Sequence, residues 1–349
     1  MSYSFKDENE LKDYTFSEIK KSFEYHYQNC DQYRKFCDLH KINPDKLSSF
    51  EDLYSIPQIP TAVFKSVDVC SVDKGTCKCC QSSGTKGIVS KIYRDEKTIR
   101  AFLGSIIDIV RDSYGIKNDN CIVYNLGPKE EEAGDLWIAY AMGFLRYEFE
   151  TYNFVHSGLL QSEKIIEQLK DHDNSKRMVL LGAPALFLRL FEYMDTIGQK
   201  LHLPNDAILF TAGGWKSKTG DTLTRSEMCE RFSEYFGISE KQYFDIYNQV
   251  ESNTPFFECK CHNKHIPAGY LVIIRDPVTF EKVEDGQEGV ITFLDPSSNS
   301  YPAFVITDDI GSVTTDCECG YKGQILHYGR RVKTVETKGC AMKLDQKMA

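Results

Sequence analysis

The chain has no long apolar run and no excess of positive charge. These two absences argue against a membrane-spanning protein and against a nucleic-acid-binding protein. Its net charge is −9 over 349 residues, so nothing in the composition attracts nucleic acid or an anionic membrane surface. No run approaches the roughly 18 apolar residues that a membrane span needs. The start, MSYSFKDENELKDYTF, lacks the cationic and then apolar segments of a signal peptide. We therefore expect a soluble, cytoplasmic protein.

Internal repeats and low-complexity linkers are also missing, and the length suits one large domain or two unequal ones. Between residues 96 and 248, apolar runs of strand length alternate with stretches of helical periodicity. This alternation predicts an α/β fold with functional groups at the strand ends. The predicted strands are CIVYNLGP (121–128), MVLLGAP (178–184), AILFTAGG (207–214) and QYFDIYN (242–248), and the predicted helices cover 96–114, 186–194 and 223–236.

The pattern changes after about residue 265. YLVIIRD, GVITFLD and AFVITDD are β-rich runs separated by prolines and glycines, and no long helical pattern follows them. We therefore expect a smaller β subdomain over about 265–328, packed on the α/β part of a core that covers 1–328.

A capping-box pattern stands near the N-terminus. Thr15-Phe-Ser-Glu18 offers a hydroxyl at the N-cap position and a carboxylate three residues later. Apolar residues then recur on one face as far as Cys30. The pattern predicts an amphipathic helix that begins at Thr15.

Thirteen cysteines are many for this chain, and their number is odd. In a reducing compartment they are not expected to form a disulfide framework. Most isolated cysteines behave as small apolar side chains. We expect that role for Cys30, Cys37, Cys121 and Cys229.

Two short turns carry paired thiols, and they need a separate explanation. The first is CKCHNKH (259–265) and the second is CEC (317–319). Zinc takes four nitrogen or sulfur ligands in a tetrahedron, which two such turns can supply, although C-x-C is tighter than the usual zinc spacing. We expect a structural Zn²⁺ site made of Cys259, His265, Cys317 and Cys319, with Cys261 or His262 as substitutes.

A hydroxyl-rich loop with one cation lies at residues 81–87, QSSGTKG. Glycines let backbone N–H groups approach an anion, hydroxyls add donors, and Lys86 supplies charge. The order of residues differs from that of a Walker A loop, G-x-x-x-x-G-K-[ST]. The loop predicts phosphate binding by Ser82, Ser83, Gly84, Thr85, Lys86 and Gly87.

This loop resembles the phosphate loop S-S-G-T-x-G of the adenylate-forming superfamily, which includes acyl-CoA synthetases and phenylacetate–CoA ligases. Further motifs similar to those of the superfamily follow in the same order. Gly213-Gly214 resembles the adenine-edge loop, and DIYNQVE (245–251) resembles D-x-Y-G-x-T-E, with Asn248 in place of the glycine. Thr307-Asp-Asp309 resembles T-G-D, and Gly329-Arg330 resembles the start of the hinge motif.

The resemblance implies a nucleotide site for ATP and Mg²⁺. Tyr247 would stack on adenine beside Asn248 and Gln249, Glu251 would hold Mg²⁺, and the Asp309 carboxylate would accept the ribose hydroxyls. Taken singly, Tyr247 has a plainer explanation as a core aromatic, Glu251 as a solvated acid and Asp309 as part of a turn. The order and spacing of the motifs favour the nucleotide site, to which Arg330 would also belong.

A narrower resemblance covers nearly the whole chain, from about residue 20 to the end. It is carried by IPTAVFK (59–65), GGWKS (213–217), FDIYNQVESNT (244–254), SYPAFVITDDIG (300–311) and KGCA (338–341). These segments are similar to those of the acyl-protein synthetase family of bacterial bioluminescence, the long-chain-fatty-acid–protein ligases. The resemblance implies a ligase that activates a fatty acid as acyl-AMP.

In that family a cysteine near the C-terminus takes the acyl group and passes it to a partner reductase, and Cys340 is the residue that matches. Residues 329–349 would then be a hinge remnant and an acyl-accepting tail, with the superfamily's C-terminal lid domain largely missing. Lys86 would offset charge on the displaced pyrophosphate. The implied partners are a fatty-aldehyde-forming reductase and an acyl thioesterase.

Two alternative functions remain open at this point. One is a phenylacetate-type ligase that releases aryl- or acyl-CoA, and the other is a non-catalytic adenylate-binding partner of a reductase. The sequence does not decide the chain length of the acid, or whether it is aliphatic or aromatic.

Overall fold

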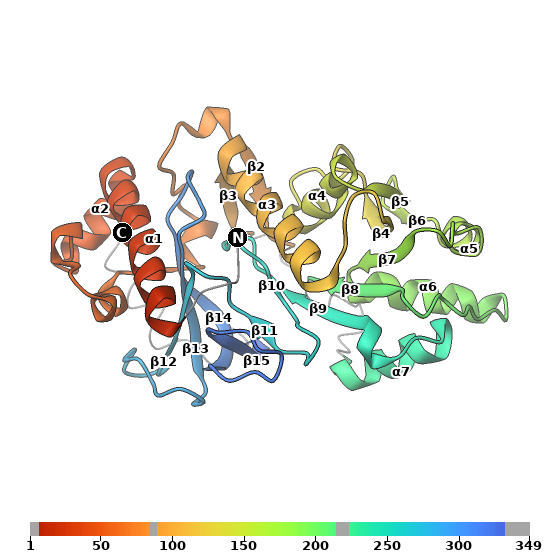
Figure 1. The fold of residues 1–349 in the computed structure, drawn as a ribbon. Helices are drawn as coiled ribbons and strands as arrows, with labels where there is room; N and C mark the ends of the chain where they lie inside the picture. The colour runs from red at the N-terminus through yellow and green to blue at the C-terminus, as the bar shows by residue number, and fades with distance from the viewer. Residues whose placement is uncertain (1–6, 84–88, 214–222, 332–349) are drawn as a thin grey trace. The chain divides into compact units, whose positions relative to one another are not determined.

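The computed structural model describes residues 7–83, 89–213 and 223–331 (Figure 1), and the chain divides into two compact units. One unit combines Met1–Asp108 with Gln249–Ala349, and the other is Ile109–Asn248. The first boundary falls within helix α3 (Glu96–Tyr114) and the second just after strand β9 (Tyr243–Tyr247). The second boundary therefore divides the motif DIYNQVE between the two units.

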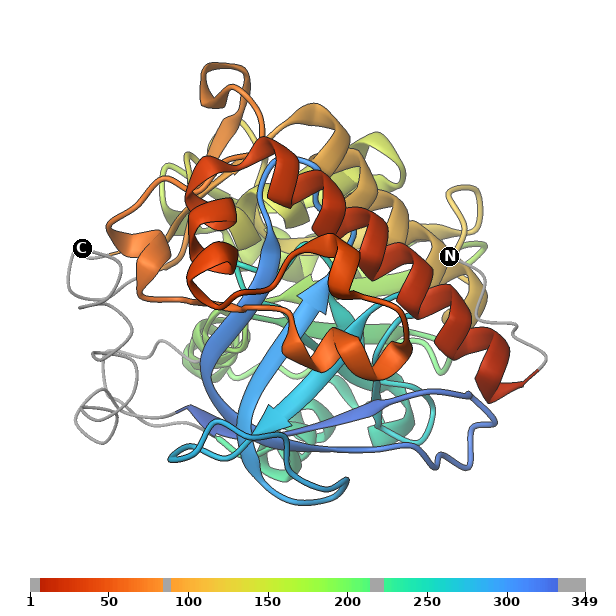
Figure 2. The same cartoon turned by 90° about the vertical axis from the view of Figure 1, so that its left-hand side faces the viewer.

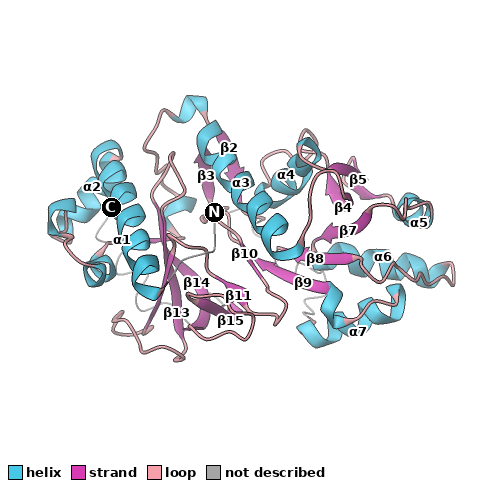
Figure 3. Ribbon diagram, in the orientation of Figure 1, coloured by secondary structure: helices cyan, strands magenta, loops and turns pink. Residues whose placement is uncertain are grey.

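The unit Ile109–Asn248 is built on a mostly parallel sheet. Its strands lie in the order β9-β8-β7-β4-β5-β6, parallel from β9 to β5 and antiparallel at β6. The other strands are β4 (Cys121–Pro128), β5 (Glu150–His156), β6 (Leu159–Leu160), β7 (Arg177–Gly182) and β8 (Ile208–Ala212). The connecting helices, coloured cyan in Figure 3, are α4 (Trp137–Phe144), α5 (Ser162–Lys170), α6 (Pro184–Thr196) and α7 (Arg225–Phe236), with 3₁₀ turns η5 (Leu145–Tyr147) and η6 (Glu240–Gln242).

The burial of the strands in the core of this unit explains why their sequences are continuous apolar runs. Strands β4, β7 and β8 are buried along nearly their whole length, as expected for a parallel sheet covered on both faces. Phe187 and Phe191 of α6 pack against Phe232 of α7, with ring centroids 5.0 and 5.7 Å apart. The two helices are thus held on the sheet by a shared aromatic cluster.

The other unit contains a second, mainly antiparallel sheet in the order β11-β15-β14-β13-β12, with β1 pairing parallel to β14. Its strands are β1 (Ile59–Pro60), β11 (Lys264–His265), β12 (Leu271–Arg275), β13 (Gly289–Asp295), β14 (Ala303–Thr314) and β15 (Ile325–Arg331). The remaining strands are the hairpin β2 (Lys78–Gln81) and β3 (Lys91–Arg94), and β10 (Phe256–Phe257).

Helix α1 (Glu8–Asn29) crosses this antiparallel sheet (Figure 2). Phe23 contacts Phe304 of β14 with ring centroids 6.4 Å apart, and His26 Nε2 lies 3.1 Å from the carbonyl oxygen of Ser298. Packing between residues 272 or more positions apart places the N-terminal helix and the β-rich segment in one unit. The helical elements that follow α1 are α2 (Asp31–Leu39), η1 (Pro44–Lys46), η2 (Phe50–Ser55), η3 (Val63–Lys65) and η4 (Lys74–Thr76).

The predicted α/β class is confirmed, and so are the helix over 96–114 and the strands over 121–128 and 289–295. The predicted start of the first helix at Thr15 is wrong. Helix α1 begins at Glu8, and Asp7 caps it by accepting the Glu10 N–H at 2.9 Å. Thr15 lies buried inside the helix, where its hydroxyl accepts the Gly269 N–H at 3.3 Å. A tertiary contact therefore uses the hydroxyl that the capping-box pattern assigned to a helix end.

Among the predicted core cysteines, Cys30, Cys37 and Cys121 are fully buried, and Cys229 is partly buried against the core of its unit. None of the helices in the described part of the chain is long and apolar enough to span a membrane.

Candidate active site

The predicted phosphate loop connects the two strands of the β2–β3 hairpin. The Ser82 N–H donates to the Ser90 carbonyl oxygen at 3.1 Å, and the Ser90 N–H donates to the Ser82 hydroxyl at 3.1 Å. These two bonds join the ends of the loop, next to the Gln81–Lys91 pair of the hairpin. Ser83 is exposed. Four predicted loop residues lie outside the described residues: Gly84, Thr85, Lys86 and Gly87.

The Ser90 side chain, at the base of this loop, lies near enough to the Glu251 carboxyl to lower its pKa. Glu251 is only 6% exposed, so it is not the solvated acid of the plainer explanation. Burial raises the pKa of the Glu251 carboxyl above its ordinary value, while the Ser90 side chain opposes that rise. A buried carboxylate beside a serine hydroxyl offers the hard oxygen ligands that Mg²⁺ prefers.

Arg94, which belongs to none of the predicted motifs, holds the backbone on both sides of Glu251. Its Nη2 donates to the carbonyl oxygens of Val250 and Ser252 at 2.6 and 2.9 Å, and its Nε donates to Asn253 Oδ1 at 3.0 Å. The Arg94 side chain is completely buried and lies over the Tyr301 ring. This guanidinium therefore links the strand that follows the phosphate loop to the segment that carries Glu251.

A sequence signal for Arg94 existed, although it is weak. On strand β3, Ile92 and Arg94 are the two buried positions, with an alternation of period two. A charged residue on the apolar side of a strand indicates a buried polar network. The partners of that network cannot be read locally, because Asn253 is 159 residues away.

Asp309 and Gln249, which belong to two different predicted motifs, are joined by a side-chain hydrogen bond. Gln249 Nε2 donates to Asp309 Oδ2. The Asp309 N–H donates to the Thr307 hydroxyl at 3.0 Å, and Arg331 Nε lies 3.9 Å from Asp309 Oδ1. Asp309 is 4% exposed, so its carboxylate is fixed by neighbours rather than by water. Arg330 is exposed on β15 opposite Ile310.

The predicted adenine-edge residues lie at the carboxyl edge of the parallel sheet in the other unit. Strands β8 and β9 pair as far as Ala212 and Ile246, and the residues that follow are Gly213 and Tyr247. Gly213 has φ +93°, a conformation that favours glycine. Tyr247 and Asn248 are both half-buried, and Gly214 lies outside the described residues. The carboxyl edge of a parallel sheet is where such folds bind ligands.

The four predicted metal ligands also come together. The side-chain ligand atoms of Cys259, His265, Cys317 and Cys319 lie within 4.8 Å of one another. Cys340 lies outside the described residues.

The family model of the acyl-protein synthetase, LuxE, matches residues 1–349. The chain belongs to the LuxE acyl-protein synthetase family. It is therefore a ligase, as the sequence resemblance implied. It is 31% identical over 352 residues to the long-chain-fatty-acid–luciferin-component ligase of Aliivibrio fischeri, a match that covers 98% of this chain and 90% of the relative. The ligase of the same name from Vibrio harveyi is 32% identical over 343 residues, covering 97% and 89%.

A solved structure extends the likeness to the fold. The chain is similar to 2-hydroxyisobutyryl-CoA ligase in complex with 2-HIB-AMP and CoA, with a TM-score of 0.74 and 15% sequence identity. The match covers 95% of this chain and 72% of that ligase. The fold of this family member is thus the fold of an adenylate-forming ligase.

Proposed function

We propose that this protein activates a long-chain fatty acid with ATP and transfers the acyl group to its own Cys340 as a thioester. The proposal rests on the family and on one observation above all. The Glu251 carboxyl is buried, and the Ser90 side chain at the base of the predicted phosphate loop lies near enough to affect its pKa. That position suits a ligand of the Mg²⁺ ion that accompanies ATP.

The first half-reaction joins the fatty acid to AMP. A carboxylate oxygen attacks the α-phosphorus of ATP, the new O–P bond forms, and pyrophosphate leaves. Mg²⁺ held by Glu251 would offset charge on the phosphates. Lys86 and the loop hydroxyls would add donors to the departing pyrophosphate. Asp309 would accept the two ribose hydroxyls, and Tyr247 would stack on the adenine.

The second half-reaction moves the acyl group to sulfur. The Cys340 thiolate attacks the carbonyl carbon of acyl-AMP, a C–S bond forms, the C–O bond to AMP breaks, and the thiol proton passes to solvent. Lys338 and Lys343 would favour the thiolate electrostatically. The thioester would then serve a partner reductase that forms the aldehyde, with an acyl thioesterase as the source of the fatty acid.

Intact-protein mass spectrometry tests both half-reactions together. The protein is incubated with Mg-ATP and a panel of fatty and aryl acids, alongside Cys340→Ser, and each sample is then treated with hydroxylamine. We expect a mass increase equal to the fatty acid minus one water, which hydroxylamine removes and which Cys340→Ser lacks. The acid that gives the largest adduct identifies the preferred substrate.

Other outcomes distinguish the alternative functions. Release of acyl-CoA after addition of CoA, with no protein adduct, would establish a CoA ligase instead. Absence of acid-dependent ATP–pyrophosphate exchange would indicate a non-catalytic partner. Exchange that persists in Cys340→Ala, while loading is lost, would separate activation from transfer.

A further inference from the structure

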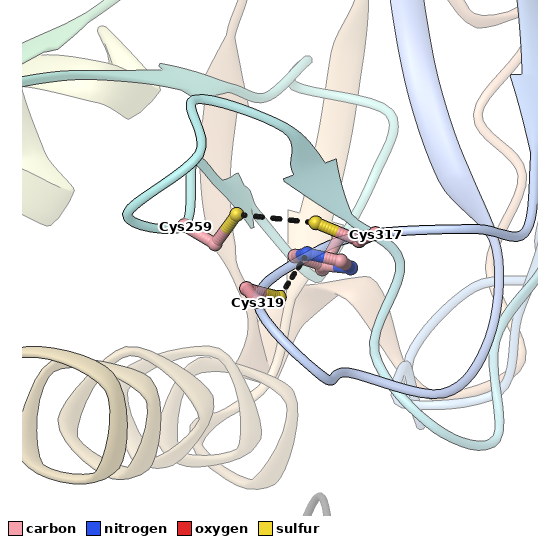
Figure 4. A group of neighbouring side chains, drawn as sticks. Cys259, Cys317 and Cys319 are labelled. Carbon is pink, nitrogen blue, oxygen red and sulfur yellow. Dashed lines mark hydrogen bonds between the residues drawn. The ribbon is translucent and has the colours of Figure 1, made fainter.

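Three thiols and one imidazole converge in a part of the chain that the proposed reaction does not use. Cys259 Sγ lies 3.7 Å from Cys317 Sγ, and Cys319 Sγ lies 3.2 Å from His265 Nε2. Figure 4 shows the sulfur atoms of the three labelled cysteines directed toward the same small space. The separation of Cys259 and Cys317 is far from the bond length of about 2.05 Å in a disulfide.

The distances match those of a tetrahedral metal site. A zinc–sulfur bond of about 2.3 Å and tetrahedral angles place two sulfur ligands about 3.8 Å apart. All four ligand atoms here lie within 4.8 Å of one another, and three thiolates with one imidazole form a common structural zinc set. We propose that Cys259, His265, Cys317 and Cys319 bind one structural zinc ion.

The surroundings of the thiols support this proposal, because each sulfur accepts a hydrogen bond from an N–H group. The Cys261 N–H donates to Cys259 Sγ at 3.3 Å, and the Tyr321 N–H donates to Cys319 Sγ at 3.4 Å. The same two-residue offset thus recurs in both turns. Asn263 Nδ2 donates to Cys317 Sγ at 3.3 Å. Such donors stabilise thiolates and orient them for a metal.

The local fold explains why these turns present their ligands together. The Cys259 N–H donates to the Asn263 carbonyl oxygen at 2.9 Å, which closes the first turn, and the Gly320 N–H donates to the Cys317 carbonyl oxygen at 3.1 Å, which closes the second. His265 lies on β11 opposite Ile325 of β15. The Tyr321 ring packs on the His265 ring with centroids 4.2 Å apart, which restricts the orientation of the imidazole.

The zinc ion would clamp the loop between β14 and β15 to the segment that leads into β11. On this hairpin, Thr314 pairs with Ile325 at the end near the loop, and Asp309 pairs with Arg331 further along. Five residues of strand separate these pairs by about 17 Å. The ion therefore has a structural role in holding the strand that carries Asp309, and all four of its positions are filled by protein.

Metal analysis of the full-length protein tests the proposal, and it is independent of the proposed function because no activity is read. The protein is purified under reducing conditions without chelator, together with Cys259→Ser, Cys317→Ser and the control Cys261→Ser. We expect about one equivalent of zinc in the wild type and in Cys261→Ser, and below about 0.2 equivalent in the two ligand variants. Removing zinc with a chelator should lower the thermal midpoint by at least about 5 °C.

Cobalt exchange keeps the test valid where a variant fails to fold. Co²⁺ added to the zinc-free wild type should give the intense visible bands of tetrahedral cobalt and a sulfur-to-cobalt charge-transfer band. Less than about half an equivalent of zinc in the wild type, with no such bands on cobalt addition, would overturn the proposal. Equal loss of zinc in Cys261→Ser and in Cys317→Ser would refute this ligand set.

Discussion

Gln249 donates a hydrogen bond from its side-chain amide to the carboxylate of Asp309, across 60 residues of sequence. The bond joins the motif that contains Glu251 to the residue proposed to hold the ribose. One oxygen of the Asp309 carboxylate is thereby oriented before any nucleotide arrives.

Substituting Gln249 tests whether this bond prepares the nucleotide site. A hydrogen bond to a charged group is worth about 1.5–3 kcal/mol, so Gln249→Ala should raise the KM for ATP at least about tenfold. Acid-dependent ATP–pyrophosphate exchange measures this value. Gln287→Ala, on the exposed surface of the same unit, should leave KM unchanged. An unchanged KM in Gln249→Ala would mean that Asp309 is oriented without it.

Glu251→Gln should increase stability while it abolishes activation. Burial raises the pKa of the Glu251 carboxyl in the folded state. The stability that the protonated carboxyl contributes is therefore fully present below the pKa of the unfolded chain. It is lost as the pH rises through the pKa of the folded state. Near neutral pH the neutral amide should therefore raise the free energy of unfolding. Pyrophosphate exchange should fall at least about 100-fold, because a charged ligand for Mg²⁺ is lost.

Denaturation curves between pH 4 and 8 measure the stability effect, with the exposed Glu163→Gln as control. The gain in Glu251→Gln should shrink toward acid pH, where the wild-type carboxyl is protonated as well. A variant that is less stable than the wild type near neutral pH would contradict this prediction.

Ser90→Ala should change the pH dependence of the reaction rather than only its rate. The Ser90 hydroxyl opposes the rise of the Glu251 pKa, so its removal should raise that pKa further. If the ionised carboxylate is the active form, the acid limb of the exchange profile should move to higher pH. A uniform loss of rate with an unmoved limb would instead indicate that Ser90 has only a structural role.

Arg94→Lys should weaken both the fold and the reaction. A lysine keeps the positive charge but cannot donate at the same time to Val250, Ser252 and Asn253. Loss of these buried bonds should cost about 3 kcal/mol of unfolding free energy, which urea denaturation measures. Lys91→Ala, on the exposed face of the same strand, is the matched control. Equal stability of Arg94→Lys and wild type would contradict the role assigned to this guanidinium.

The sequence pattern correctly predicted helices and strands that depend only on residues close to one another in the sequence. The helix over 96–114 and the strand over 121–128 have the predicted bounds. The apolar pattern that defines each of them lies entirely within the segment itself. The capping box at Thr15 failed for the opposite reason. A four-residue motif fits the interior of a helix as well as its start, and the contact of Thr15 with Gly269 decides between them.

The candidate site likewise contains residues that belong to local sequence motifs and residues that are defined by contacts far apart in the sequence. The order of the motifs predicted that Ser82, Gly213, Tyr247, Glu251 and Asp309 belong to one nucleotide site. Neither Arg94 nor Ser90 belongs to such a motif, and both act through partners more than 150 residues away. A buried network of this kind depends on which strands lie side by side. The order of residues in the sequence does not show which strands are neighbours.

The sequence alone determined the family, the α/β class and the set of residues able to bind a metal, since these depend on residue types and their order. Only the tertiary structure separated His265 from His262, which the sequence left as a substitute. The pairing of β11 with β15 brings the His265 imidazole beside the Cys319 thiol, whereas the His262 ring faces the Glu258 carboxylate at 3.5 Å. Strand pairing and burial select among neighbouring side chains of similar chemistry, because they fix direction as well as distance.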